Sequence, residues 1–261
     1  MVKLNEILDF LKEMAPESLA ESYDNVGLLL DRDGECVENV VLTLDTDCAV
    51  IDEAKAKNAE LIISHHPLIF NPVKRVTEES EIGRSIKRLV KNNIALFAMH
   101  TNFDSVKNGL CDFLAEKIFG KSDFLNFLGE DESGIGRVLE LDEEMFFSEI
   151  CNKAKNALKL DYLRVVGEDD KKIKKIAIVG GGGGSMTVDA LKLGADCYIS
   201  GDFKYQHGRD ASNSGLSLIE ITHYDAEIIF GEYVKKLLKD KFGEKICVHI
   251  SCENTNVWRT V

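Results

Sequence analysis

Residues 39–66, NVVLTLDTDCAVIDEAKAKNAELIISHH, contain the unit that decides the fold. The apolar, β-branched runs at its two ends predict buried strands, and the stretch between them has the composition of a helix. A helix that connects two such strands is typical of a parallel sheet in an α/β protein. Two histidines, His65 and His66, follow the second strand directly.

The same alternation of short apolar runs and helical segments extends along the chain. Residues 1–15 have apolar positions at helical spacing and predict an amphipathic helix. With these two strands included, strands are predicted at 39–44, 61–64, 94–99, 162–166, 173–179, 196–200, 216–221 and 245–250. Further helices are predicted at 49–58, 82–92, 110–119, 145–158, 187–193 and 226–241. The predicted fold class is α/β, with mixed sheets flanked by helices in two interlinked domains.

The most irregular stretch is 120–136, where GKSD and GEDESGIG interrupt the pattern, and we place a domain join there. We expect residues 1–121 and 219–261 to form one α/β domain and residues 122–218 to form a second, inserted α/β domain. The two halves share a strand-helix rhythm that is compatible with a pseudo-repeat.

The composition bounds the function. The chain has 261 residues, of which 44% are apolar, so it has enough apolar matter for a core and is not a disordered protein. Its 45 acidic and 32 basic residues give a net charge of −13, which disfavours binding to nucleic acid or to an anionic membrane surface. The short basic cluster at 171–175 is interpreted as the solvated entrance of a strand.

Seven scattered cysteines without a C-x-x-C pair indicate reduced thiols rather than a disulfide framework or a zinc knuckle. The charged N-terminal helix does not resemble a signal peptide, and no apolar run has the roughly 20 residues of a membrane span. A cytoplasmic location is therefore expected.

Histidines mark the candidate site. The chain has six, and four of them, His65, His66, His100 and His223, follow predicted strands. In open α/β sheets, ligands bind at this carboxyl edge because the crossover connections leave a crevice there. The acidic residues Asp104 and Glu227 follow two of the histidines, which favours a converging cluster.

Pro67 restricts His66 to extended conformations, and neighbouring side chains of an extended chain point to opposite sides. His65 and His66 therefore suit two different metal ions, or one ion and one supporting role, better than one shared ion. The alternative is a pair of buried, hydrogen-bonded histidines at a turn.

Each remaining donor also has a structural interpretation. Asp104 could bridge two cations through its two oxygens, or could simply stabilise a turn. His223 and Glu227 are four residues apart and would share one helix face, although any helix offers such pairs by accident. His249 lies within an apolar run and is interpreted as a structural strand residue.

The glycine run 180–184 lies between a predicted strand and a predicted helix. It matches neither the P-loop nor the G-x-G-x-x-G spacing, so we interpret it as a flexible loop, with anion binding at the helix N-terminus as the alternative.

Taken together, these motifs resemble the dinuclear-metal-centre hexameric proteins, also known as GTP cyclohydrolase I type 2 homologues. The resemblance covers almost the whole chain. It is carried by YDNVGL at 23–28, HHPLIF at 65–70, HTNFD at 100–104, GIGRV at 134–138, IAIVGGGGG at 176–184, GADCYISGDFKY at 194–205 and THYDAE at 222–227.

The resemblance implies a site for two divalent metal ions at the carboxyl ends of the strands, between the two domains. The implied ligands are His65, His66, Asp104, His223 and Glu227, with the two carboxylates as bridging candidates. His100 would lie beside the site as a supporting or proton-transfer group. A toroidal homohexamer with its sites facing an internal cavity is also implied.

The chain departs from the family pattern at several positions. Thr222 stands where the family usually has Gly, and Ala226 where it usually has Ser or Thr. Gln206 occupies the position of a family histidine, and His207 comes one residue later. No site role is carried onto Gln206 or His207.

Imidazole and carboxylate donors without thiolates suit Zn²⁺, Mn²⁺, Fe²⁺ or Co²⁺. Two such ions support hydrolysis of a C–N or phosphoester bond, and the family name implies a purine nucleotide as substrate. The first hypothesis is therefore a metal-dependent hydrolase of a small substrate. The second is a metal-binding assembly without catalysis that stores or delivers metal or serves as a scaffold.

Overall fold

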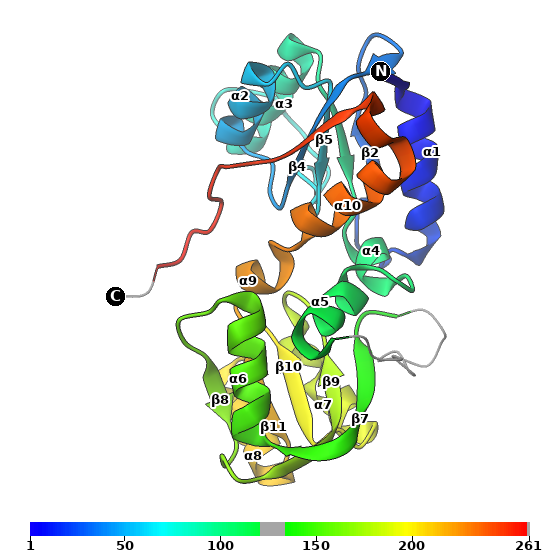
Figure 1. Ribbon diagram of the computed structural model, residues 1–261. Helices are drawn as coiled ribbons and strands as arrows, with labels where there is room; N and C mark the ends of the chain where they lie inside the picture. The colour runs from blue at the N-terminus through cyan, green and yellow to red at the C-terminus, as the bar shows by residue number, and fades with distance from the viewer. Residues whose placement is uncertain (121–133, 260–261) are drawn as a thin grey trace. The chain divides into compact units, whose positions relative to one another are not determined.

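The computed structural model describes residues 1–120 and 134–259 (Figure 1). The chain divides into two compact units. The first consists of Met1–Phe103 and Phe230–Val261, and the second is Asp104–Ile229. The second unit is thus an insertion between two segments of the first.

The first unit is built on a five-stranded mixed sheet in the order β12-β4-β5-β6-β2. Its strands are β2 (Gly27–Leu30), β4 (Asn39–Thr43), β5 (Leu61–Ser64), β6 (Ala95–Ala98) and β12 (Cys247–Ile250). The four strands from β12 to β6 run parallel, and β2 is antiparallel to β6 at one edge. A separate small ribbon pairs β1 (Val2–Lys3) with β3 (Cys36–Val37).

Four long helices flank this sheet, with α2 and α3 on one side and α1 and α10 on the other (Figure 1). They are α1 (Leu4–Met14), α2 (Cys48–Ala56), α3 (Glu81–Asn92) and α10 (Phe230–Phe242). One core lies under α2 and α3 and includes Val41, Ile51 and Ile62. Because strand side chains alternate between faces, the buried neighbours Val40 and Ile63 belong to the opposite face.

The second unit repeats this plan. Its sheet has the order β7-β9-β10-β11-β8, with a parallel centre and an antiparallel strand at each edge. The strands are β7 (Arg137–Phe146), β8 (Arg164–Val166), β9 (Lys172–Ile178), β10 (Cys197–Ser200) and β11 (Ser217–Glu220). The helices are α4 (Thr101–Ser105), which begins in the first unit, α5 (Leu110–Phe119), α6 (Phe147–Leu158), α7 (Thr187–Lys192), α8 (Tyr205–Ser214) and α9 (His223–Glu227). In Figure 1, α6 lies on the near face of the sheet and α7 and α8 on the far face.

A buried ion pair joins helix α5 to strand β7 in the second unit. The Arg137 side chain is only 1% exposed, and its Nε and Nη2 each donate to one oxygen of Asp112 at 2.7 Å. Nη1 and Nη2 also donate to the backbone oxygens of Gly134, Gly136 and Val106. These bonds compensate the cost of burying the charge.

The α/β class with mixed sheets and flanking helices is confirmed. The sequence did not predict strands β1, β2, β3 and β7 or helices α4 and α8, and it merged the end of α9 with α10. The second half of β7 is mostly exposed, so it lacks the apolar run by which the other strands were found. Along the chain, the boundaries between the compact units fall at 103/104 and 229/230, whereas the sequence analysis expected them at 121/122 and 218/219. The difference arises because α5 and α9 pack with the second unit. Residues 121–133 of the expected join lie outside the described residues.

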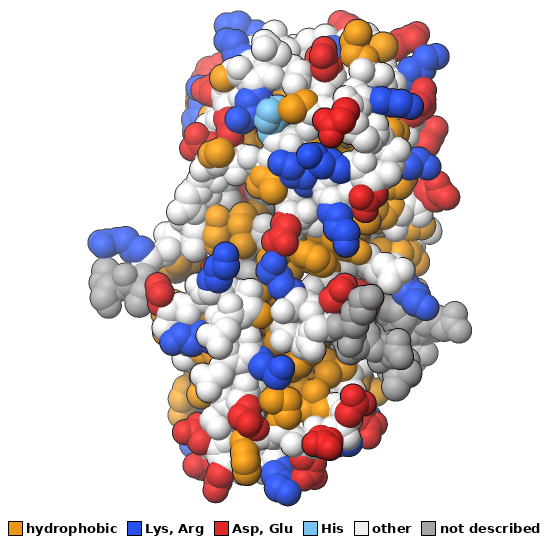
Figure 2. Space-filling view, viewed as in Figure 1, with side chains coloured by type: hydrophobic (Ala, Val, Ile, Leu, Met, Phe, Trp, Pro, Cys, Tyr) orange, Lys and Arg blue, Asp and Glu red, His pale blue; other side chains and the backbone are white. Residues whose placement is uncertain are grey.

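On the face drawn in Figure 2, acidic and basic side chains are interspersed. Of the helices in residues 1–120 and 134–259, none combines the length and apolar character that crossing a membrane requires.

Candidate metal centre

His65 and His66 follow β5 in the first unit, where the chain bends after Ser64. The His65 side chain is buried, and its Nδ1 lies 2.7 Å from the backbone oxygen of Met99. His66 is partly exposed, and its Nδ1 lies 2.8 Å from Oδ1 of Asp45. Because the acceptors are a carbonyl and a carboxylate oxygen, each Nδ1 carries the proton and donates.

His100 follows β6 and is held in the same way. Its Nδ1 lies 2.9 Å and 2.8 Å from the two oxygens of Asp24, whose side chain is fully buried. The Asp24 carboxylate also accepts from the backbone N–H and the hydroxyl of Thr101. Burial opposes ionisation of Asp24, but the hydrogen bonds from His100 and Thr101 outweigh it and hold the pKa of this carboxyl well below its ordinary value.

These three imidazoles form one cluster. One ring nitrogen each from His65, His66 and His100 lies within 4.8 Å of the other two, a spacing compatible with a shared metal ion. The rings of His65 and His66 have centroids only 5.2 Å apart. The prediction that the two side chains point to opposite sides was therefore wrong, because the chain bends at these residues instead of continuing as an extended strand.

The second unit contains the other three predicted donors. Asp104, on α4, and Glu227, at the end of α9, are 7% and 3% exposed, and one oxygen of each lies within 4.8 Å of the other. His223, at the start of α9, places Nε2 3.1 Å from Oε2 of Glu227, as the four-residue spacing predicts. Two buried carboxylates this close repel each other, and a cation or a shared proton relieves the repulsion.

A carboxylate also orients His223. Its Nδ1 lies 2.8 Å from Oδ2 of Asp202, which follows β10. In all four strand-end histidines Nδ1 therefore faces an oxygen acceptor, and in His223 Nε2 faces a second one, on Glu227. This arrangement fixes the tautomer and ring orientation of metal-binding histidines in proteins. The donor set of both units thus fits a divalent metal.

The glycine run, which follows β9, packs against these residues. Gly181 has a φ of +59°, and a Cβ there would lie 1.9 Å from Oε1 of Glu227. Gly183 is buried and donates its backbone N–H to Oγ of Ser200. The segment is a loop with a short 3₁₀ turn at Gly183–Met186, and within it Gly181 packs closely against a candidate ligand.

The departures from the family pattern have local structural roles. Thr222 is the N-cap of α9, where its hydroxyl oxygen accepts from the backbone N–H of Asp225, and Ala226 is buried. His207 accepts from the backbone N–H of Lys204 at the start of α8. Thr222 therefore caps the helix that carries His223 and Glu227.

His249, on β12, is interpreted from sequence as a strand histidine, and this is confirmed. Burial, together with the neighbouring Lys57 and Lys235, lowers the pKa of its imidazole. It therefore stays neutral at neutral pH.

Three carboxylates orient histidines of the site but were not among the functional residues predicted from the sequence: Asp24, Asp45 and Asp202. A signal was present for Asp45 and Asp202, which follow strands β4 and β10 in the same way as the histidines follow theirs. Applying the strand-end rule to aspartates as well as histidines would have found them.

Among the described residues, the candidate donor groups contain imidazoles and carboxylates and no thiol. All seven cysteines are free, in agreement with the sequence analysis. Burial raises the pKa of the Cys111 thiol to about 12, so this group stays protonated at neutral pH.

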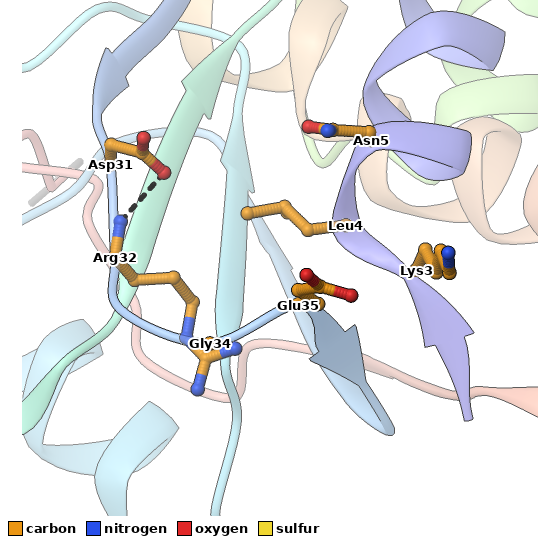
Figure 3. Close-up of a pocket in the computed structure, with 7 residues that line it drawn as sticks. All are labelled: Lys3, Leu4, Asn5, Asp31, Arg32, Gly34 and Glu35. Carbon is orange, nitrogen blue, oxygen red and sulfur yellow. Dashed lines mark hydrogen bonds between the residues drawn. The ribbon is translucent and has the colours of Figure 1, made fainter.

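A polar hollow of about 300 Å³ lies elsewhere in the first unit, between the start of α1 and the loop that follows β2 (Figure 3). It is lined by Lys3, Leu4, Asn5, Asp31, Arg32, Gly34 and Glu35. The Arg32 guanidinium donates to the backbone oxygens of Asn93 and Cys36 and so fastens the loop. Asn93 precedes β6, whereas His100 follows it, so the hollow lies at the other end of this strand from the histidines.

The fold and the donors define a class: a two-unit α/β protein whose parallel strands end in histidine and carboxylate groups that could hold metal. Comparison with known proteins narrows this class. The chain belongs to the Duf34/NIF3 (NGG1p interacting factor 3) family, whose model matches residues 2–257.

Curated relatives carry the name GTP cyclohydrolase 1 type 2 homolog. One from Clostridium perfringens is 43% identical over 228 residues, with 87% of each chain covered. Another, from Lactococcus lactis, is 35% identical over 260 residues, with 98% of each chain covered.

Solved structures confirm the fold. The Staphylococcus aureus hypothetical protein SA1388 is 30% identical and superposes with a TM-score of 0.91 over 100% of this chain and 99% of its own. Reduced HcgD from Methanocaldococcus jannaschii is 28% identical, with a TM-score of 0.83 over 97% and 98% of the two chains.

Proposed function

We propose that this chain is a metal-dependent hydrolase of a small substrate. Two divalent ions, Zn²⁺, Mn²⁺, Fe²⁺ or Co²⁺, would be held by His65, His66, Asp104, His223 and Glu227. The homohexamer and the cytoplasmic location stay predictions from the sequence.

The observation that carries the proposal is the common orientation of the strand-end histidines. Histidines that merely fill a core have no need for an oxygen acceptor on the same ring nitrogen in every case. Here each Nδ1 lies against an oxygen of Met99, Asp45, Asp24 or Asp202, which turns the Nε2 side of every ring toward the other donors. Such a set, with oxygen partners that hold the rings in place, is the arrangement found around metal-binding histidines.

When bound, a pair of divalent ions lowers the pKa of a water molecule and polarises the bond to be hydrolysed. The contribution of the protein chain itself is proton handling. His100 donates to Asp24 through Nδ1, so its Nε2 is available to accept a proton from the attacking water and to return it to the leaving group. The buried Asp24 carboxylate stabilises the imidazolium that forms in between.

The substrate class is taken from the relatives. Because they are named GTP cyclohydrolase 1 type 2 homolog, we propose a purine nucleotide, hydrolysed at the carbon of its imidazole ring with release of formate. Purified protein loaded with Zn²⁺, Mn²⁺, Fe²⁺ or Co²⁺ in turn is incubated with GTP, and formate is measured. Formate should appear with at least one metal and should fall at least tenfold in His100→Gln, consistent with loss of a general base.

Absence of formate with all four metals would contradict the purine assignment. A transfer experiment then distinguishes the remaining alternative. A storage or delivery protein should pass its ions to a metal-free acceptor protein within minutes, whereas a catalytic pair should stay bound. The His249→Gln variant serves as the control in both assays, because His249 lies on β12 and is not among the predicted ligands.

A further inference from the structure

Two exposed aromatic side chains lie beside the histidine cluster of the first unit. Tyr23 is 62% exposed and Phe70 is 41% exposed. Their ring centroids are 6.3 Å apart with a tilted geometry, and the Phe70 centroid is 6.3 Å from that of His100. The rings of His65 and His66 lie 5.2 Å and 5.4 Å from His100, so five rings form a continuous group.

The loops that carry the two aromatic residues are fastened together. Asn25 donates from Nδ2 to the backbone oxygen of Ile69 at 2.5 Å, and these two residues lie within two positions of Tyr23 and next to Phe70. Asp24, between Tyr23 and Asn25, is bound to His100. The hydrogen bond between Asp24 and His100 therefore holds the neighbour of Tyr23 at the cluster, and the bond between Asn25 and Ile69 holds the neighbour of Phe70 close to it.

The exposure of this pair is not forced by a lack of buried space. In the same unit, Phe97 and Phe103 are at most 1% exposed, so this unit does bury phenylalanine rings. Neighbouring exposed aromatic groups next to a cluster of polar donors are typical of ligand sites, where an apolar surface binds and a few polar groups fix orientation.

We propose that Tyr23 and Phe70 stack against a planar heteroaromatic ring of the substrate and so place its reacting carbon beside His100. Aromatic faces accept such rings with little dependence on the pattern of their polar substituents, while His100 supplies a polar contact at the edge of the group. The proposal deepens the proposed function, on which it rests, and assigns binding of the ring to the first unit.

The test compares the binding of nucleotides with the binding of ribose 5-phosphate, which has the sugar phosphate but lacks the base. Binding of GMP, AMP, UMP and ribose 5-phosphate to the metal-loaded protein is measured by titration calorimetry. At least one nucleotide should bind tighter than ribose 5-phosphate, and Tyr23→Leu and Phe70→Leu should each weaken it roughly tenfold, because leucine cannot stack. Tyr23→Phe should keep the wild-type affinity.

Tyr205→Leu is the matched control, because Tyr205 is an 80% exposed tyrosine at the start of α8 in the other unit. It should leave the affinity for all four compounds unchanged. Metal content is determined for every variant and should equal that of the wild type. A loss of nucleotide affinity at full metal content is then a loss of stacking.

Two results would overturn the proposal. One is wild-type protein that binds no nucleotide tighter than ribose 5-phosphate. The other is an unchanged nucleotide affinity in the Tyr23→Leu and Phe70→Leu variants. This holds also if light scattering shows that the two substitutions change the self-association of the protein. Failure of the proposed function looks different: the protein would hold no metal or release no formate, while the preference for a base would remain.

Discussion

The two units place donors at the same edge of similar sheets but hold them by different means. In the first unit, three imidazoles are oriented by hydrogen bonds to Asp24, Asp45 and the backbone of Met99. In the second, Glu227 lies against Gly181, where a Cβ would come within 1.9 Å. The first unit therefore depends on side chains that orient the donors. The second unit depends, in addition, on the absence of a side chain at Gly181.

The contrast predicts that the second unit is the more sensitive to single substitutions. The largest effect should come from Asp112→Ala, which leaves the buried Arg137 guanidinium without its carboxylate. Breaking a buried pair in this way costs about 3 kcal/mol of unfolding free energy. Urea denaturation measures it, with Asp189→Ala as the control, since the Asp189–Lys192 pair is exposed and should contribute less than about 1 kcal/mol. Equal stability of both variants would contradict this account of the ion pair.

The next largest effect should come from Gly181→Ala. A side chain here meets Glu227 and adopts a left-handed backbone, so we expect a loss of about 2 kcal/mol together with reduced metal content. Gly194→Ala separates the two causes, because Gly194 has a φ of +71° but no atom within 4 Å of a Cβ. It should lose about 1 kcal/mol and keep its metal. Normal metal content in Gly181→Ala would show that the close contact does not matter.

The carboxylates that orient the histidines should have smaller effects that are similar in the two units. Asp45→Ala and Asp202→Ala remove the acceptors of His66 and His223. Loss of such a partner typically weakens metal binding 10- to 100-fold, here measured by competition with a chelator. A change below twofold in both variants would mean that these contacts do not prepare the rings for metal.

The smallest effect should arise in the C-terminal segment of the first unit. Thr255 donates from Oγ1 to Oδ2 of Asp45, the carboxylate that orients His66, at 2.8 Å. Thr255→Val should weaken metal binding only a few-fold, because the Thr255 hydroxyl acts on the site indirectly, through Asp45 and then His66. Thr255→Ser should restore it. If valine and serine behave alike, the hydroxyl does not act through Asp45.

Much of this arrangement could be predicted from the sequence, because strand periodicity and residues at strand ends are local signals. They located His65, His66, His100 and His223 at one edge of the sheets. The packing of Gly181 on Glu227 joins residues far apart in the chain and leaves no local pattern. The exposed second half of β7 and the bend at His65 were missed because tertiary contacts, rather than local preference, determine them.

Metal content tests the central claim most directly. Protein purified without added metal or chelator is analysed for transition metals, beside Asp104→Ala and the surface control Asp240→Ala. The account predicts close to two ions per chain in the wild type and in Asp240→Ala, and loss of the ions from a folded Asp104→Ala. Wild-type protein that contains no metal, takes up none when it is added, and is as stable as Asp104→Ala would contradict it.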